Sequence, residues 1–152
     1  MGFSGIIMIL ISHRGNIEGP NPPMENNPNY IDNAITMGYD VEIDVRSIAG
    51  KCYLGHDHPE HKVEWKYLIN SKLWCHAKNI EALDIMLDLK VHCFWHQGDD
   101  VVLTSKGYVW TFPGRRLTSK SICVLPELLG GIGFGESAGI CSDYVDRYKI
   151  WK

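Results

Sequence analysis

Two histidines, one arginine and two carboxylates are the residues whose types and spacing could do chemistry. His13 and Arg14 follow an apolar run, Glu42 and Asp44 stand two positions apart further along, and His56 comes after them. Carboxylate oxygens are the ligands that hard cations such as Mg²⁺ and Ca²⁺ prefer. Histidine moves protons near neutral pH, and arginine can bind a phosphate through two nitrogens. These residue types predict metal-assisted acid–base chemistry on a phosphate ester.

The carboxylate pair lies on a predicted strand, Tyr39–Arg46, that alternates polar and apolar residues. One face carries Asp40, Glu42, Asp44 and Arg46, and the other carries Val41, Ile43 and Val45. Glu42 and Asp44 then point the same way, roughly 7 Å apart along the strand. If this face is buried, a cation must meet the two charges. The alternative is a solvated strand edge with alternating charges.

His56 is brought to this strand by a predicted hairpin. The segment Arg46–Leu54 turns around Ala49-Gly50-Lys51. Folding back symmetrically about Gly50 places position 56 opposite position 44. We therefore expect His56 to reach the carboxylate pair, with Asp57 next to it orienting the ring.

The remaining segments predict strands that alternate with helices or short connections. Expected strands are Ile6–Ser12, Tyr39–Arg46, Leu73–Lys78, His92–His96, Tyr108–Phe112, Ser121–Leu125 and Gly139–Asp143, and expected helices are Asn29–Met37, Trp65–Asn70 and Asn79–Leu89. This order favours an α/β fold with a parallel sheet. Chemistry-bearing residues cluster at strand ends, namely His13, Asp44, Lys78, His96 and Asp143. We therefore expect a compact TIM-type (β/α) barrel of seven or eight strands with reduced helices.

Length and composition limit the classes of function. The chain has 152 residues, which indicates one domain over residues 1–152, and 45% of them are hydrophobic. A net charge of −3 without a basic block argues against a nucleic-acid partner. The five cysteines are odd in number and widely spaced, which favours buried free thiols in a reducing compartment. No apolar run approaches transmembrane length, so we expect no membrane span, and the free thiols favour the cytoplasm.

Several motifs match one family in their order along the chain. They are His13-Arg14-Gly15, Glu25-Asn26, Gly38–Val45, His56-Asp57, Tyr108–Thr111 and Gly139–Tyr144. In this order the chain resembles the glycerophosphodiester phosphodiesterase family, relatives of the phosphatidylinositol-specific phospholipases C, in a short form. The resemblance implies a TIM-type barrel and a role in lipid metabolism. It also implies metal-dependent cleavage of a small phosphodiester to a phosphomonoester and an alcohol.

The resemblance assigns roles to the matching positions. It implies that His13 and His56 form the acid–base pair, that Glu42 and Asp44 bind the metal, and that Arg14 binds the phosphate. One histidine would deprotonate the attacking oxygen, from water or from a neighbouring substrate hydroxyl. The other would protonate the leaving alkoxide.

The third metal ligand departs from the family pattern. His76 stands where the family has a glutamate. As a direct ligand it would favour Mn²⁺ or Zn²⁺ over Mg²⁺ or Ca²⁺, and it could instead bind a metal-bound water. Glu127 is a possible substitute carboxylate. Lys78 occupies the family's lysine position and would meet the phosphate charge.

Other interpretations remain open at the sequence level. Asp143 could hydrogen-bond a catalytic histidine, and His96 could touch the substrate or the metal or be a hydrogen-bonded core histidine. The whole chain could be a non-catalytic relative that binds a phosphorylated metabolite, because the third acidic ligand is lost. It could also be a zinc hydrolase of another class, although no HExxH motif occurs among its seven histidines.

Overall fold

The computed structural model describes residues 7–131 and 133–151. Within these residues ten strands form one sheet. The strands are β1 (Ile9–His13), β2 (Asp40–Ile48), β3 (Lys51–Leu54), β4 (His61–Val63), β5 (Leu73–Ala77), β6 (Cys93–Trp95), β7 (Val101–Leu103), β8 (Val109–Thr111), β9 (Ser121–Val124) and β10 (Gly139–Ser142). The helices are α1 (Pro28–Thr36) and α2 (Ile80–Asp88), with 3₁₀ helices η1 (Trp65–Ile69), η2 (Pro126–Leu129) and η3 (Val145–Trp151).

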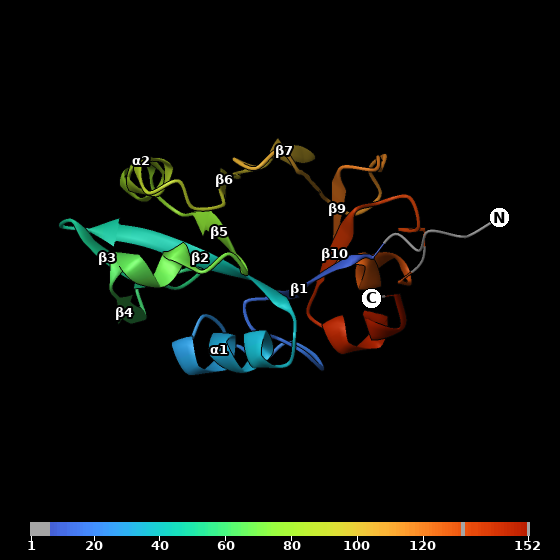
Figure 1. Ribbon diagram of the computed structural model, residues 1–152, viewed down its shortest axis with the longest axis horizontal. Helices are drawn as coiled ribbons and strands as arrows, with labels where there is room; N and C mark the ends of the chain where they lie inside the picture. Colours follow the sequence, from blue (N-terminus) through green and yellow to red (C-terminus); the bar gives the residue numbers. More distant parts are fainter. Residues whose placement is uncertain (1–6, 132, 152) are drawn as a thin grey trace.

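Most of the sheet is parallel, and β1 lies near its centre (Figure 1). Parallel ladders join the strands in the order β6-β5-β2-β1-β10-β9-β8. The last strand, β7, is antiparallel to β8, and the hairpin of β3 and β4 extends from the end of β2. The carboxyl ends of the parallel strands therefore meet at one edge, where His13 and Asp44 lie.

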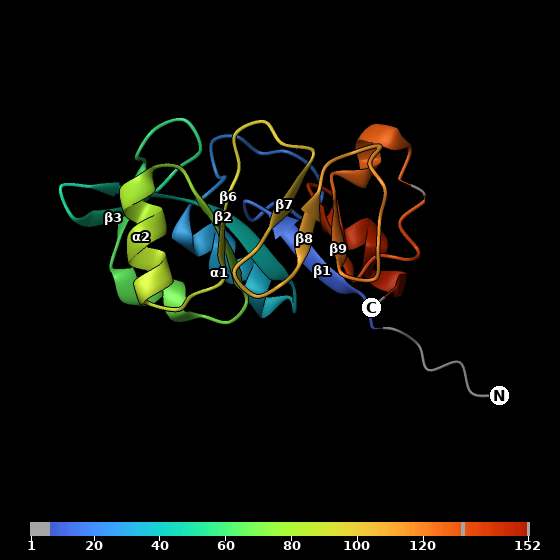
Figure 2. The same ribbon diagram turned by 90° about the horizontal axis from the view of Figure 1, so that it is seen from above.

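The expected TIM-type barrel is wrong, because the sheet curls into an open half-barrel. Among the described residues no strand ladder joins β6 to β7, although Ser105 N donates to Cys93 O at 2.8 Å. The α-helices lie over one half of the sheet, and none covers β7, β8 and β9 (Figure 2). The parallel strands β8 and β9 are joined by residues 112–120, too few for a crossover through a helix, which needs a dozen or more residues.

The apolar face of β2 packs against the two α-helices, as its alternation predicts. Val41, Ile43 and Val45 are fully buried, and they share one core cluster with residues of α1 and α2, namely Ile31, Ala34, Ala82 and Met86. Asparagines cap both helices: the Asn27 side chain accepts from Asn29 N, and the Asn79 side chain accepts from Ala82 N. This packing turns the acidic face of β2 into the concave side of the sheet.

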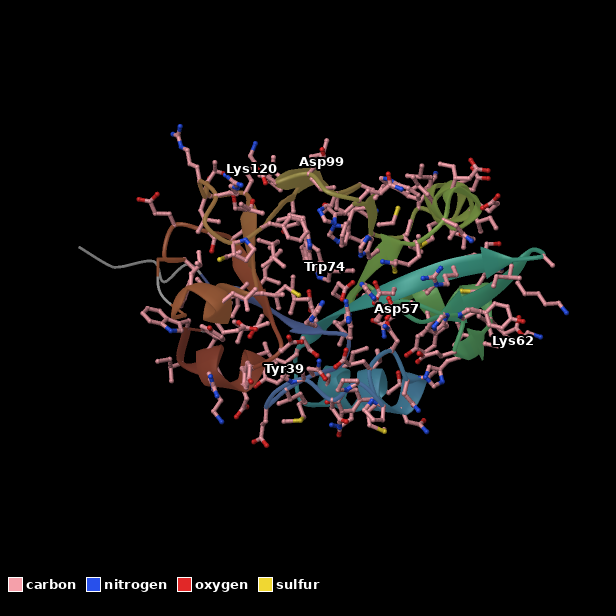
Figure 3. All side chains as sticks on the ribbon, turned by 180° about the vertical axis from the view of Figure 1, so that it is seen from behind. Tyr39, Asp57, Lys62, Trp74, Asp99 and Lys120 are labelled. Atoms are coloured by element: carbon pink, nitrogen blue, oxygen red, sulfur yellow. The ribbon has the colours of Figure 1, made fainter. Side chains whose placement is uncertain are left out.

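Aromatic side chains fill the concave side below the strand ends. Trp74, labelled in the interior in Figure 3, is buried in one cluster with Phe94 and Trp110. The rings of Phe94 and Trp110 are 4.7 Å apart, and His76 stacks on Phe94 at 5.0 Å. One side of the acidic group of β2 therefore adjoins apolar aromatic side chains, which exclude water from that side.

Two expectations about the whole chain can be compared with the structure. All five cysteines are buried free thiols, and burial raises the pKa of the Cys75 and Cys141 thiols, so both stay protonated. In the described part of the chain no helix is long and apolar enough to cross a membrane.

Candidate metal and acid–base site

Three side chains from neighbouring strands form a group that could hold a metal ion. Glu42 and Asp44 on β2 are 2% and 0% exposed, and Asp44 is paired in register with His76 on β5. One ligand atom from each residue lies within 4.8 Å of the others. Within the described residues, Glu42 Oε2 and Asp44 Oδ1 are buried without a hydrogen-bond partner. The structure thus brings together the three residues predicted as metal ligands.

The orientation of the His76 ring suits a metal ligand. Its Nε2 lies 3.3 Å from the main-chain oxygen of His96, and its Nδ1 lies 3.4 Å from Asp44 Oδ1 and 3.8 Å from Glu42 Oε1. A carbonyl oxygen only accepts, so Nε2 carries a hydrogen and Nδ1 faces the carboxylates. Histidine ligands of metals commonly donate their second ring nitrogen in this way. Two carboxylates and one imidazole fit Mg²⁺, Mn²⁺ or Zn²⁺.

Without an ion, His76 itself supplies positive charge to the group. Burial lowers its pKa, but the neighbouring carboxylates of Asp44 and Glu42 outweigh burial and raise the pKa to about 9. Burial raises the pKa of Asp44, but His76 and the charge of Arg14 hold it well below its usual range. A metal ion at this site would therefore replace the proton on His76.

His13 is held beside the group by Asp143. Its Nδ1 is 2.7 Å from Asp143 Oδ1, and its Nε2 is 3.7 Å from Glu42 Oε2. Burial lowers the pKa of His13, but the hydrogen bond with Asp143 and the charge of Glu42 outweigh burial and raise it. The suggested hydrogen bond between Asp143 and a histidine is confirmed, and that histidine is His13.

Asp143 is itself fixed by neighbours that the sequence did not point to. Asn16 Nδ2 donates to Asp143 Oδ1 at 2.9 Å, and the Tyr30 hydroxyl donates to Asn16 Oδ1 at 3.0 Å. Glu127 accepts from the main-chain nitrogen of Asp143 at 3.0 Å and from Ser142 Oγ at 2.9 Å. Glu127 therefore supports the end of β10 and is not part of the metal group, so the suggestion of a substitute ligand is wrong.

Arg14 and Asn26 meet on the far side of Asp44. Arg14 Nε is 3.3 Å from Asp44 Oδ2, and another guanidinium nitrogen is 3.3 Å from Glu25 Oε1. Asn26 binds Asp44 twice, because Nδ2 donates to Oδ2 and Oδ1 accepts from Asp44 N, both at 2.9 Å. Sequence reasoning quoted Glu25-Asn26 only as a motif and missed this clamp. The left-handed backbone at Asn26, with φ 63°, is tolerated by asparagine and aims its side chain at Asp44.

The predicted hairpin is confirmed, but its register is wrong by one residue. Val45 pairs with Leu54, and Gly55 N donates to Asp44 O at 3.1 Å, so Gly55 and not His56 lies opposite Asp44. The reason is a two-residue turn at Ala49 and Gly50, with φ of 50° and 75°. The symmetry of the hairpin therefore falls between these residues.

His56 consequently lies at the rim of the group. Its Nδ1 is 2.8 Å from Asp57 Oδ1 as expected, and its side chain is 39% exposed. No hydrogen bond or ion pair within the described residues joins His56 to Glu42 or Asp44. It shares a cavity of about 290 Å³ with Arg14, Glu25 and Asn26. The two histidines are thus near the group, but only His13 is in contact with it.

Lys78 and two further histidines lie outside the metal group. Lys78 lines a second cavity of about 360 Å³ at the ends of β5 and β6. His96 donates from Nε2 to Asp99 O at 2.9 Å and stacks on Phe112. His92 is bonded to Thr104 Oγ1 at 2.7 Å, and burial lowers its pKa to about 4, as for a neutral core histidine.

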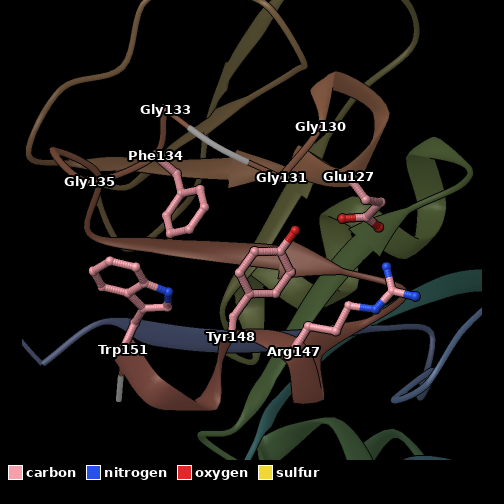
Figure 4. Close-up of a pocket in the computed structure, with 9 residues that line it drawn as sticks. All are labelled: Glu127, Gly130, Gly131, Gly133, Phe134, Gly135, Arg147, Tyr148 and Trp151. Atoms are coloured by element: carbon pink, nitrogen blue, oxygen red, sulfur yellow. The ribbon is translucent and has the colours of Figure 1, made fainter.

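A further cavity lies away from the site of this chemistry. It measures about 610 Å³ and lies between η2 and η3, against the rings of Phe134, Tyr148 and Trp151 (Figure 4). One of its lining residues, Glu127, accepts from the main-chain nitrogen of Asp143, the partner of His13. The cavities that contain Arg14 and Lys78, in contrast, adjoin the acidic group.

Comparisons of the chain with family models, with curated proteins and with solved structures give no match. The resemblance to glycerophosphodiester phosphodiesterases therefore rests on the motifs quoted above. Function has to be argued from the arrangement of the side chains.

Proposed function

We propose that this chain is a metal-dependent phosphodiester hydrolase that cleaves a small phosphodiester to a phosphomonoester and an alcohol. The observation that carries the proposal is the buried group of Glu42, Asp44 and His76, whose ligand atoms lie within 4.8 Å of one another. His13 supports the same conclusion, because Asp143 fixes its Nδ1 while its Nε2 faces Glu42. A buried acidic group beside an oriented histidine suits acid–base chemistry on an anionic ester.

Glu42, Asp44 and His76 would hold the divalent cation. When bound, the cation supplies positive charge that offsets the charge developing on the phosphoryl oxygens. Arg14 binds the non-bridging oxygens of the phosphate from the neighbouring cavity. Asp44 and Glu25 hold the guanidinium of Arg14 in place, so little side-chain freedom is lost when the phosphate binds.

The two histidines divide the proton transfers between them. His13 has a raised pKa, so it holds the proton that it gives to the leaving alkoxide. His56, with Asp57 on its Nδ1, takes the proton of the attacking oxygen, which comes from water or from a neighbouring hydroxyl of the substrate. The cavity of about 290 Å³ around Arg14 and His56 fits a small substrate.

Turnover of bis(p-nitrophenyl) phosphate and of glycerophosphocholine tests this function. We expect activity that EDTA removes and that Mn²⁺ or Mg²⁺ restores. His13→Ala and His56→Ala should each lower kcat by about a hundredfold or more, the usual contribution of a positioned acid or base. His58→Ala is the matched control, since His58 is exposed in the same loop. Full activity in both His13→Ala and His56→Ala would contradict the acid–base roles.

A second function is favoured by the position of His56. Because only His13 contacts the acidic group, the chain could bind a phosphorylated metabolite through the metal and Arg14 without cleaving it. Calorimetry with Mn²⁺ and a phosphomonoester separates the two functions. Metal-dependent phosphate binding without turnover of any diester would establish the binding function.

We also propose that the protein works in the cytoplasm. All five cysteines are buried free thiols, and none is paired in a disulfide. Such cysteine usage is typical of reducing compartments. Unchanged folding in the presence of a reductant is the expected result.

A further inference from the structure

Two cavities lie on opposite sides of the strand that carries the acidic group. The main-chain oxygen of Asp44 accepts from Gly55 N, and that of Val45 accepts from Lys78 N. Successive carbonyls of a strand point to opposite edges. The loop with His56 therefore adjoins one edge of β2, and the end of β5 with Lys78 adjoins the other.

One residue that lines the second cavity also contacts the metal group. It measures about 360 Å³ and is lined by Ala77, Lys78, Trp95, His96 and Gln97. The main-chain oxygen of His96 is the partner of His76 Nε2. A molecule in this cavity would thus lie next to the ligand His76, on the side away from Arg14.

Lys78 gives this cavity a positive charge that the protein leaves uncompensated. Its side chain is half-buried, and among the described residues no carboxylate lies within ion-pair distance of its ammonium group. Arg14 and Lys72 differ, because Arg14 is bound to Asp44 and Glu25, and Lys72 is 3.3 Å from Asp40. Arg46 on β2 is held by the main-chain oxygens of Gly55 and His56. A lysine ammonium without a protein partner in a polar cavity suits an anionic ligand group.

The other side chains that line the cavity are held in fixed positions by the protein. The imidazole of His96 is fixed by Asp99 O and by stacking on Phe112 at 4.0 Å. Trp95 packs against the core beneath α2 and provides an apolar surface. These side chains hold their positions without a ligand, which favours selective binding.

We propose that this cavity binds one ester substituent of the phosphodiester and that Lys78 makes it selective for a substituent with its own anionic group, such as a carboxylate. The proposal rests on the phosphodiesterase function proposed above. The scissile phosphate lies over the acidic group and Arg14, so the two cavities take the two halves of the diester. Lys78 then contacts the substituent instead of the scissile phosphate, which differs from the role that the sequence predicts for it.

A matched pair of substrates tests the proposal. Glycerophosphoserine and glycerophosphoethanolamine differ only in one carboxylate on the substituent. We expect kcat/KM to be about tenfold higher for glycerophosphoserine, as for one charge-assisted contact, mainly through KM. In Lys78→Met this ratio should fall to about one, Lys78→Arg should restore it in part, and Lys66→Met, an exposed lysine on η1, should leave it unchanged.

The possible outcomes separate this proposal from the proposed function. If Lys78→Met lowers kcat/KM equally for both substrates, Lys78 binds the scissile phosphate and the proposal is overturned. A ratio near one in the unaltered protein also overturns it. If neither diester is cleaved, the phosphodiesterase function fails, and calorimetry with phosphoserine and phosphoethanolamine decides the selectivity of the cavity. Tighter binding of phosphoserine that is lost in Lys78→Met supports the proposal, and equal binding overturns it.

Discussion

At the scale of single residues, Asp143 determines what His13 can do. Its carboxylate binds Nδ1 of His13 at 2.7 Å and leaves Nε2 toward Glu42. An arrangement in which a carboxylate orients an imidazole fixes both the tautomer and the direction of proton transfer. The role of His13 therefore depends on a residue 130 positions away in the sequence.

The variant Asp143→Asn tests this dependence. The hydrogen bond and the charge of Asp143 raise the pKa of His13, so their loss should lower that pKa. We expect kcat to fall by about 10- to 100-fold, as for other partners that orient a functional histidine. The limb of the pH–rate profile that belongs to His13 should move to lower pH. Asp99→Asn, in an exposed loop, is the control, and a profile that does not move would contradict the positioning role.

The identity of residue 76 should determine which metal binds best. An imidazole nitrogen favours Zn²⁺, whereas a third carboxylate favours Mg²⁺ and Ca²⁺. In His76→Glu we therefore expect the ratio of Zn²⁺ to Mg²⁺ affinity to fall by about tenfold or more. Calorimetric titration of each metal measures the ratio, with His92→Gln as the control, since His92 is bonded to Thr104 outside the group. The same ratio in both proteins would mean that His76 is not a ligand.

At the scale of elements, the sequence predicts most segments well because their patterns are local. The alternation in β2 and the capped helices α1 and α2 depend on neighbouring residues only. The hairpin register was wrong because Ala49 and Gly50 form a two-residue turn, and one residue of difference moves His56 away from Asp44. The clamp by Asn26 depends on a left-handed residue in an irregular loop, which no periodic pattern indicates.

Gly55 controls where the loop after the hairpin goes. Its φ is 150°, and a Cβ there would lie 1.8 Å from the main-chain oxygen of His58. In Gly55→Ala the loop has to move, and His56 moves with it. We expect a loss of turnover of about tenfold or more while metal affinity is unchanged, because the metal group lies outside the loop. Gly98→Ala, which meets no atom within 4 Å, is the control, and equal activity of both variants would contradict the need for a placed His56.

At the scale of the whole molecule, the sequence could not indicate whether the sheet closes into a barrel. Whether β6 meets β7 depends on pairing between distant segments and on the length of the turns around β7 and β8. The site tolerates the opening, because its residues come from β1, β2, β5 and β10, which are joined by continuous parallel ladders. Half of a barrel is thus enough to hold the acidic group and His13.

The dependence of the stability of the whole molecule on pH should differ with and without metal. In the metal-free protein His76 has a pKa of about 9, above its ordinary 6.5. The stabilisation from its proton is complete below pH 6.5 and is lost as pH rises through 9, a change on the order of 3 kcal/mol.

The bound metal removes this dependence between pH 6.5 and 8.5, because neither the metal-bound folded state nor the unfolded state then holds a proton on residue 76. It binds only when His76 has lost its proton, so the stabilisation by metal increases with pH in this range. Urea unfolding at several pH values, with EDTA or with saturating Mn²⁺, measures both slopes. We expect the free energy of unfolding to fall with pH in EDTA, and the difference between Mn²⁺ and EDTA to grow with pH. Parallel curves in EDTA and in Mn²⁺ would show that the metal does not displace a proton from His76, and would remove His76 from the ligand set.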